Sequence, residues 1–62
     1  MEPKYKINNE VKLKDGSKAL ITAIFQEDYG CYSYEYQSDY IGDGRVSEAD
    51  IVAVTKEDFY SK

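Results

Sequence analysis

The sequence predicts an all-β protein of five short antiparallel strands, and three features of its 62 residues support this prediction. Tyr32, Tyr34 and Tyr36 recur at every second position, which is the period of a strand and not of a helix. An Asp-Gly pair at 15–16 is a tight-turn signal between two hydrophobic segments. The longest apolar run, residues 18–26, contains β-branched side chains that favour a strand.

The first two predicted strands form a hairpin. Near the N-terminus, Tyr5 and Ile7 alternate with lysines, which indicates a short edge strand before an Asn-Asn turn. Residues 10–14 then alternate polar and apolar, so Val11 and Leu13 are expected on the buried face. The Asp-Gly turn that follows is so short that the next strand must return antiparallel.

The second strand needs an irregularity. Ile21 and Ile24 are three positions apart, so strict alternation cannot place both side chains on the buried face. A β-bulge near Thr22 and Ala23 would place both inward. A helix through residues 18–26 is the competing interpretation.

The second half of the chain is predicted as three further strands separated by turns. In chain order its segments are a polar turn at 27–30, strand 31–37, a loop at 38–44, strand 45–47, one helical turn at 47–50 and strand 51–54. Thr55, followed by acids, suits the N-cap of a final helical turn. Residues 55–62 are therefore expected to form a turn or a tail.

Several motifs follow one another in the order of a known superfamily. They are Ile7-Asn8-Asn9-Glu10-Val11, Asp15-Gly16, Ala19-Leu20-Ile21-Thr22-Ala23-Ile24, the alternating tyrosines and Val46-Ser47-Glu48-Ala49-Asp50-Ile51. This order resembles the SH3-like small β-barrel superfamily, with its bacterial and bacteriophage members and the KOW and Tudor-like domains. The resemblance implies one domain over residues 1–62, a five-stranded antiparallel barrel with its core in residues 5–54 and a 3₁₀ turn before the last strand.

The sequence departs from the usual pattern of this superfamily in two respects. Asn8-Asn9 stands where Gly-Asp is frequent, and the chain lacks the tryptophan of domains that bind PxxP peptides. A fold-level resemblance of this kind does not transfer a function.

Composition excludes several classes of site. Cys31 is the only cysteine and histidine is absent, so neither an intramolecular disulfide nor a zinc site of the usual Cys/His type is possible. No secretory signal and no transmembrane run is visible, and a single cysteine suits a reducing cytoplasm. The chain opens with methionine and is expected to be a complete, cytoplasmic protein without a cofactor.

Charge is unevenly distributed along the chain. Residues 1–18 hold five lysines and three acids, whereas residues 27–50 hold seven acids and Arg45 alone. The formal net charge of −4 argues against nucleic-acid binding, which normally requires a basic surface. The acidic region is either a solvated surface that keeps the protein soluble or a site for a basic partner.

An enzyme is not expected. Without histidine, a nucleophilic Cys31 lacks its usual base, and this side chain is expected to be partly buried at the start of a strand. Loop carboxylates are too common to indicate hydrolysis. The acids at 39, 43 and 50 match an EF-hand spacing, but Ile41 offers no oxygen ligand and the flanking segments are predicted strands, so no metal site is expected.

Two tyrosines flank the tyrosine strand from predicted turns, where large aromatic side chains have less structural reason to be. Tyrosine is enriched at protein interfaces because it combines apolar area with a polar tip. Tyr29 and Tyr40, together with Asp39 and Asp43, therefore form the predicted partner-binding surface. The alternative is that these tyrosines only cover the open ends of the barrel.

The sequence predicts a non-catalytic protein-interaction module. The chain is expected to be a small phage or mobile-element protein that docks on a bacterial partner. Tyrosines anchor the contact and acids steer a basic protein surface. Three alternatives remain: an acidic decoy that imitates the phosphate backbone, a homodimer through an exposed strand edge, and a nucleic-acid-binding SH3-like domain. The last would use Lys4, Lys6, Lys12 and Lys14 with tyrosines stacking on bases.

Overall fold

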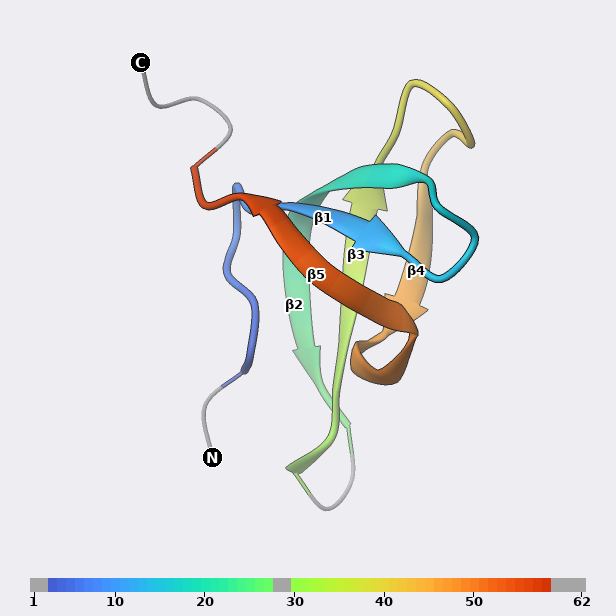
Figure 1. Ribbon diagram of the computed structural model, residues 1–62. Coiled ribbons are helices and arrows are strands. Elements are labelled where there is room, and N and C mark those ends of the chain that lie inside the picture. The colour runs from blue at the N-terminus through green and yellow to red at the C-terminus, as the bar shows by residue number, and fades with distance from the viewer. Residues whose placement is uncertain (1–2, 28–29, 59–62) are drawn as a thin grey trace.

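The computed structural model describes residues 3–27 and 30–58 of the chain. Within these residues the chain forms five strands, with a 3₁₀ turn before the last of them (Figure 1). They are β1 (Glu10–Leu13), β2 (Lys18–Gln26), β3 (Tyr32–Gln37), β4 (Gly44–Ser47), the 3₁₀ turn η2 (Glu48–Asp50) and β5 (Ile51–Lys56). The predicted all-β class, the five strands and the 3₁₀ turn before the last strand are confirmed, and the helical interpretation of residues 18–26 is wrong.

All neighbouring strands are antiparallel, and their order across the sheet is β4-β3-β2-β1-β5. The expected closed barrel is not observed, because β4 and β5 remain separate edges among the described residues (Figure 1). The long strand β2 serves both halves of the sheet: its first residues pair with β1 and its remainder with β3. The sheet is strongly bent but open.

The predicted bulge in β2 is confirmed. The register between β2 and β3 shifts between Ile21, which lies opposite Tyr36, and Ala23, which lies opposite Glu35. Ile21 is fully buried, and Ile24 packs against the core from a partly buried position. The extra residue therefore turns both isoleucines toward the interior, as the spacing required.

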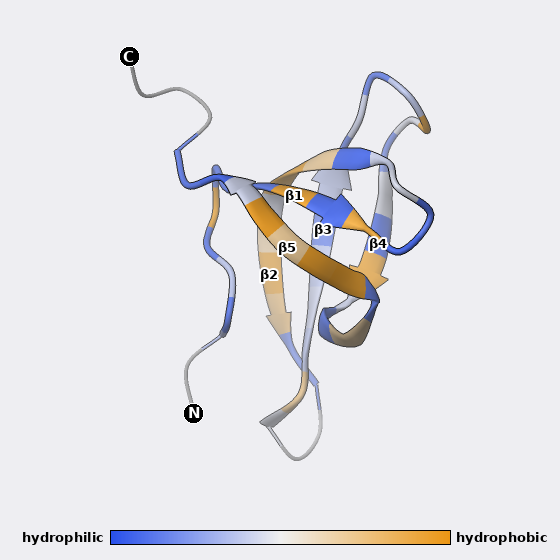
Figure 2. Ribbon diagram, viewed as in Figure 1, coloured by the Kyte–Doolittle hydropathy of each residue, from blue (hydrophilic) through white to orange (hydrophobic). Residues whose placement is uncertain are grey.

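Tyrosine supplies much of the core. Tyr32 and Tyr34 are buried and Tyr36 packs against them from a half-buried position, so the three rings share the inner face as predicted. Figure 2 shows β3 as nearly neutral in hydropathy, although β1, β2 and β5 contain strongly hydrophobic residues. The reason is that a tyrosine buries a large apolar ring while its hydroxyl lowers its hydropathy. The buried core comprises Tyr5, Val11, Leu13, Ala19, Ile21, Tyr32, Tyr34 and Ile51.

The N-terminal segment is not the edge strand that the alternation indicated. Residues 7–8 form a turn in which Asn8 has φ 74°, a left-handed conformation that asparagine tolerates. Ile7 is 54% exposed, so its apolar character does not reflect burial. Asn9 closes the turn, because its backbone N–H donates to Lys6 O and its side-chain Oδ1 accepts from Lys6 N.

Tyr5 belongs to the buried core and contacts both β3 and β5. Its backbone N–H donates to Tyr34 Oη at 3.3 Å, and its hydroxyl donates to Ile51 O at 3.4 Å. Its ring meets that of Tyr34 edge-on, with centroids 5.6 Å apart and planes inclined at 75°. A buried aromatic side chain from the N-terminal segment thus links β3 to the start of β5.

The last strand is longer than predicted. β5 continues through Thr55 and Lys56, and Thr55 Oγ1 donates to Glu10 O and to Glu10 Oε1 across to β1. Thr55 therefore does not cap a helical turn, because its hydroxyl is engaged within the sheet. The final aromatic pair at 59–60 lies outside the described residues. The described part of the chain contains no helix that is long and apolar enough to cross a membrane.

Candidate functional site

The loop that joins β3 to β4 is held by one serine. Ser38 Oγ donates to Lys18 O at 2.8 Å, which ties the loop to β2. The same oxygen accepts from the backbone N–H groups of Tyr40 at 3.1 Å and Ile41 at 3.4 Å. Gly42 N donates to Ser38 O at 3.0 Å, and its φ of 77° suits glycine. These bonds fix the backbone of the loop.

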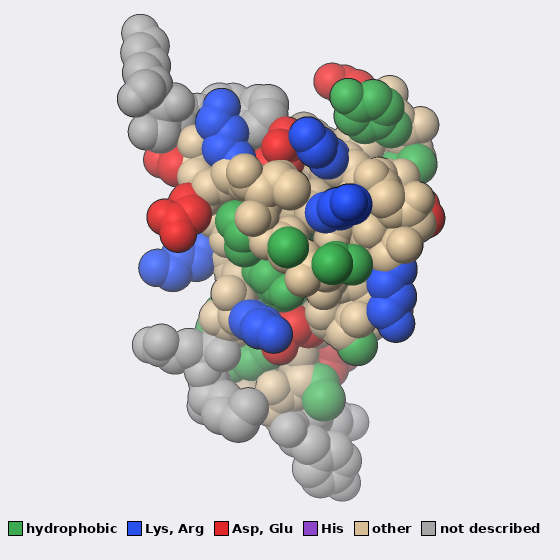
Figure 3. Space-filling model, viewed as in Figure 1, with side chains coloured by type: hydrophobic (Ala, Val, Ile, Leu, Met, Phe, Trp, Pro, Cys, Tyr) green, Lys and Arg blue, Asp and Glu red, His purple; other side chains and the backbone are tan. Residues whose placement is uncertain are grey.

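This fixed loop presents apolar side chains to solvent. Tyr40 is 77% exposed and Ile41 is 42% exposed. Figure 3 shows hydrophobic and acidic side chains standing out together over the loop between β3 and β4. Since no core contact accounts for the position of the Tyr40 ring, this residue is the best candidate for a contact with another molecule.

Asp39 is beside Tyr40, and together they line a shallow cavity of about 200 Å³. Glu10 and Lys18 contribute charged groups from β1 and β2 to the same cavity. A second hollow, of about 380 Å³, lies on the β1–β2 turn and is also lined by Tyr40 and Lys18, together with Asp15. The ring of Tyr40 thus borders two hollows, both of which contain at least one carboxylate.

Asp43 belongs to a different depression. It lines a cavity of about 470 Å³ with Glu35, Tyr36 and Arg45, on the β3–β4 part of the sheet. The structure therefore places Asp39 and Tyr40 together and Asp43 beyond them on the same loop. All three side chains are exposed.

Tyr29 lies outside the described residues, so its part in the predicted surface stays a prediction. The described residues nearest to it, Glu27 and Gly30, precede β3, whereas Tyr40 follows that strand. A strand of six residues is about 20 Å long. The candidate surface is accordingly built on Tyr40.

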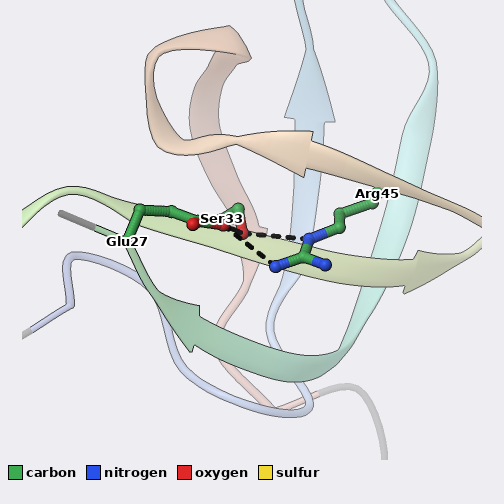
Figure 4. A network of polar contacts seen from close by, with 3 residues as sticks. All are labelled: Glu27, Ser33 and Arg45. Carbon is green, nitrogen blue, oxygen red and sulfur yellow. Dashed lines mark hydrogen bonds and ion pairs between the residues drawn. The ribbon is translucent and has the colours of Figure 1, made fainter.

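Arg45 is engaged on the outer face of the sheet, which sequence reasoning did not anticipate (Figure 4). Its Nε donates to Ser33 Oγ at 3.0 Å and its Nη2 donates to Glu27 Oε1 at 2.9 Å. Ser33 Oγ also donates to Glu27 Oε1, at 2.8 Å. The guanidinium lies 4.1 Å from the ring centroid of Phe25, within cation–π range. Strand pairing brings these residues together: Ser33 lies opposite Phe25 on β2 and opposite Ser47 on β4, two residues from Arg45.

A second polar cluster holds the 3₁₀ turn. The Tyr34 hydroxyl donates to Glu48 Oε2 at 2.6 Å, and Lys4 N donates to the same oxygen at 3.3 Å. Burial, with the neighbouring carboxylate of Glu48, raises the pKa of Tyr34 to about 12. Tyr34 is therefore a neutral hydrogen-bond donor at physiological pH, and its place is structural.

Cys31 is exposed and not partly buried as expected, because it precedes β3 instead of entering the sheet. The acids that matched an EF-hand spacing are not gathered, since Asp39 and Asp43 line different cavities and Asp50 pairs with Lys14 at 3.6 Å. Within residues 3–27 and 30–58, no group of three or more potential metal ligands comes together.

Charge is distributed unevenly over the surface. Lysines are spread over the face of β1 and β5 that Figure 3 presents, and Lys12 and Lys18 are direct cross-strand neighbours. The described acids of residues 27–50 instead belong to β3, η2 and the loops that adjoin β2, β3 and β4. The lysines and the acids, which are separated along the sequence, therefore also lie mainly on different strands of the sheet.

Comparison with known proteins gives no relative for this chain. No family model, no curated protein and no solved structure matches it. The case for a function therefore depends on the side chains and contacts described above.

Proposed function

We propose that this chain is a non-catalytic protein-interaction module whose docking surface is built on Tyr40. The observation that carries the proposal is a ring that is 77% exposed on a loop whose backbone is fixed by Ser38. An anchor whose backbone is already held in place loses less conformational entropy on binding, so more of its contact energy appears as affinity. Ile41 extends the apolar area beside it.

Carboxylates around the anchor select the kind of partner. Asp39 is next to Tyr40 and Asp43 follows on the same loop, and both are exposed. Acids at the rim of an interface speed association with a basic surface and disfavour acidic partners. We therefore propose a partner protein with a basic surface.

The strand order and the 3₁₀ turn before β5 support an SH3-like arrangement for this sheet, left open between β4 and β5. The proposed setting is the bacterial cytoplasm, with the chain as a small phage or mobile-element protein that docks on a bacterial protein.

Substitution of the anchor tests the proposal. Tyr40→Ala should weaken capture of a partner from bacterial lysate by about thirtyfold, because central aromatic anchors contribute about 2 kcal/mol or more. Val52→Ala is the matched control, since Val52 is also an exposed apolar residue (59%) but lies on β5. Quantitative mass spectrometry of the captured proteins, with circular dichroism to confirm folding, is the measurement. Equal capture by both variants would refute a docking surface at Tyr40.

The alternatives differ in their response to the same tests. An acidic decoy needs Asp39 and Asp43 but not the ring of Tyr40, so Asn at both positions would abolish its binding while Tyr40→Ala would not. Nucleic-acid binding needs exposed rings for stacking, whereas Tyr5, Tyr32 and Tyr34 are buried. A shift of single-stranded oligonucleotide at low salt would favour that alternative over the proposed function.

A further inference from the structure

The two edges of the sheet are protected to different extents. An edge strand exposes a row of backbone N–H and C=O groups that can pair with another chain, and proteins commonly obstruct such edges. β5 and β4 are the two edges in this fold.

β5 is obstructed. Its register against β1 shifts twice, between Glu10 and Val11 and between Lys12 and Leu13, and such bulges twist an edge away from regular pairing. The N-terminal segment also occupies backbone groups at both ends of the strand. Tyr5 donates to Ile51 O, and the side-chain amide of Asn9 donates to the carbonyl of Glu57 just past the strand.

β4 has neither form of obstruction. It pairs with β3 in a continuous register from Gly44 to Ser47, and no other described segment forms a ladder with it. The long side chain of Arg45 instead lies on the sheet face, where it bonds to Ser33 and Glu27 (Figure 4). Its guanidinium lies over the ring of Phe25. Val46 packs against the core, and Gly44 has no side chain.

We propose that β4 accepts an extended, basic segment of the partner protein as a sixth strand of the sheet. This proposal rests on the proposed function and specifies how the partner is held. Strand addition would supply affinity through main-chain hydrogen bonds, and the loop that carries Tyr40 ends where β4 begins. A segment on this edge would therefore begin beside the loop that carries Tyr40.

Charge identifies the segment. Asp43 precedes β4 and Asp50 follows it in η2, and both are exposed, so a carboxylate stands near each end of the edge. The ion pair of Asp50 with Lys14 is itself exposed to solvent. Lysine or arginine on the added strand would complement these carboxylates, and an acidic strand would be repelled.

A defined peptide tests strand addition on the whole chain. The probe is a blocked seven-residue peptide in which lysine and valine alternate, and the measurement is amide hydrogen exchange of residues 44–47 by NMR. With free peptide at about ten times its Kd, outward-facing amides of β4 should exchange about tenfold more slowly, because they are open only in the unbound fraction. Amides of β5 should not change.

Two matched peptides show what the binding requires. Glutamate in place of lysine should abolish binding if charge selects the segment. N-methylation of alternate residues keeps the charge but removes the donors needed for pairing, and it should also abolish protection. No binding by the lysine–valine peptide, or binding without protection of β4, would overturn the proposal. Protection that rises with protein concentration alone would overturn it in favour of self-association.

The two experiments distinguish a failure of strand addition at β4 from a failure of the docking surface at Tyr40. If Tyr40→Ala abolishes partner capture while the β4 amides remain unprotected, the docking surface stands and strand addition is wrong. If the peptide protects β4 while capture does not depend on Tyr40, the edge is a binding site but the proposed anchor is wrong.

Discussion

Tyr34 is fully buried, and its hydroxyl is nevertheless hydrogen-bonded on both sides. The hydroxyl donates to Glu48 and accepts from the backbone of Tyr5, which links β3, η2 and the N-terminal segment. No buried side-chain polar atom of the described residues lacks a hydrogen-bond partner. Tyrosine therefore serves as the large apolar side chain of this small core and as the donor that fixes the 3₁₀ turn.

Removal of this hydroxyl should destabilise the fold. Tyr34→Phe leaves the ring in place but removes a partner from Tyr5 N and from the Glu48 carboxylate. We expect a loss of about 1–3 kcal/mol in the free energy of unfolding, measured by urea denaturation. Tyr40→Phe is the control, since Tyr40 is exposed, and it should change stability very little. Equal effects of the two variants would contradict this role for Tyr34.

Tyr34 should also limit stability at high pH. Its folded pKa of about 12 lies above the ordinary tyrosine value of 10.0, because burial and Glu48 disfavour the phenolate. The stabilisation is complete below about pH 10 and is lost as the pH rises through 12, on the order of 2 kcal/mol in all. Urea denaturation between pH 9 and 12 should show this loss in the native chain. In Tyr34→Phe the corresponding part of the slope should be absent.

Single residues were predictable from sequence only where a local pattern governs them. The period of two placed Tyr32, Tyr34 and Tyr36 on one face, and the structure confirms it. The place of Tyr5 in the core was not predictable, because its contacts are with Tyr34 and Ile51, far away along the chain. Local alternation carries no information about such contacts.

At the scale of elements, irregular pairing gives the sheet its shape. The bulge in β2 was predictable because two isoleucines three positions apart can both face the core only if the strand contains an extra residue. The two register shifts between β1 and β5 were not predictable, because the apolar pattern of neither strand indicates them. The extension of β5 was missed because Thr55 resembles an N-cap until its cross-strand bond to Glu10 is seen. A turn or cap signal in the sequence is therefore weaker evidence for the local structure of a segment than the strand with which that segment pairs.

The pairing of β3 with β4 depends on a glycine. Tyr36 lies opposite Gly44, and a Cβ built on Gly44 would stand 2.6 Å from Tyr36 Oη and 2.9 Å from its Cζ. Gly44→Ala should therefore displace the Tyr36 ring and cost about 1–3 kcal/mol in unfolding free energy. The double variant with Tyr36→Leu should recover part of that loss, as a double-mutant cycle by urea denaturation would show. Purely additive costs would contradict the contact.

At the scale of the whole molecule, a chain of 62 residues has little stability to lose. A domain of this size is stable by about 3–9 kcal/mol. Tyr5→Ala would remove a buried aromatic side chain at a cost of about 3–5 kcal/mol. We therefore expect this variant to lose about half or more of its stability and to unfold at a much lower urea concentration, measured by circular dichroism. An unchanged unfolding midpoint would show that the N-terminal segment is dispensable.

The candidate site was predictable in part. Composition and turn position selected Tyr40, Asp39 and Asp43, and the structure places these side chains on one exposed loop. Two features required the fold: Asp43 lines a separate depression, and Ser38, bonded to Lys18 O on β2, holds the backbone at Tyr40. The open edge at β4 likewise depends on strand order.

Binding kinetics with a captured partner test the docking surface most directly. If Tyr40 anchors and the acids steer, Tyr40→Ala should raise the dissociation rate about thirtyfold with little change in association rate. Asn at both 39 and 43 should lower the association rate and flatten its dependence on salt. Unchanged dissociation from Tyr40→Ala would contradict the anchoring role of this tyrosine.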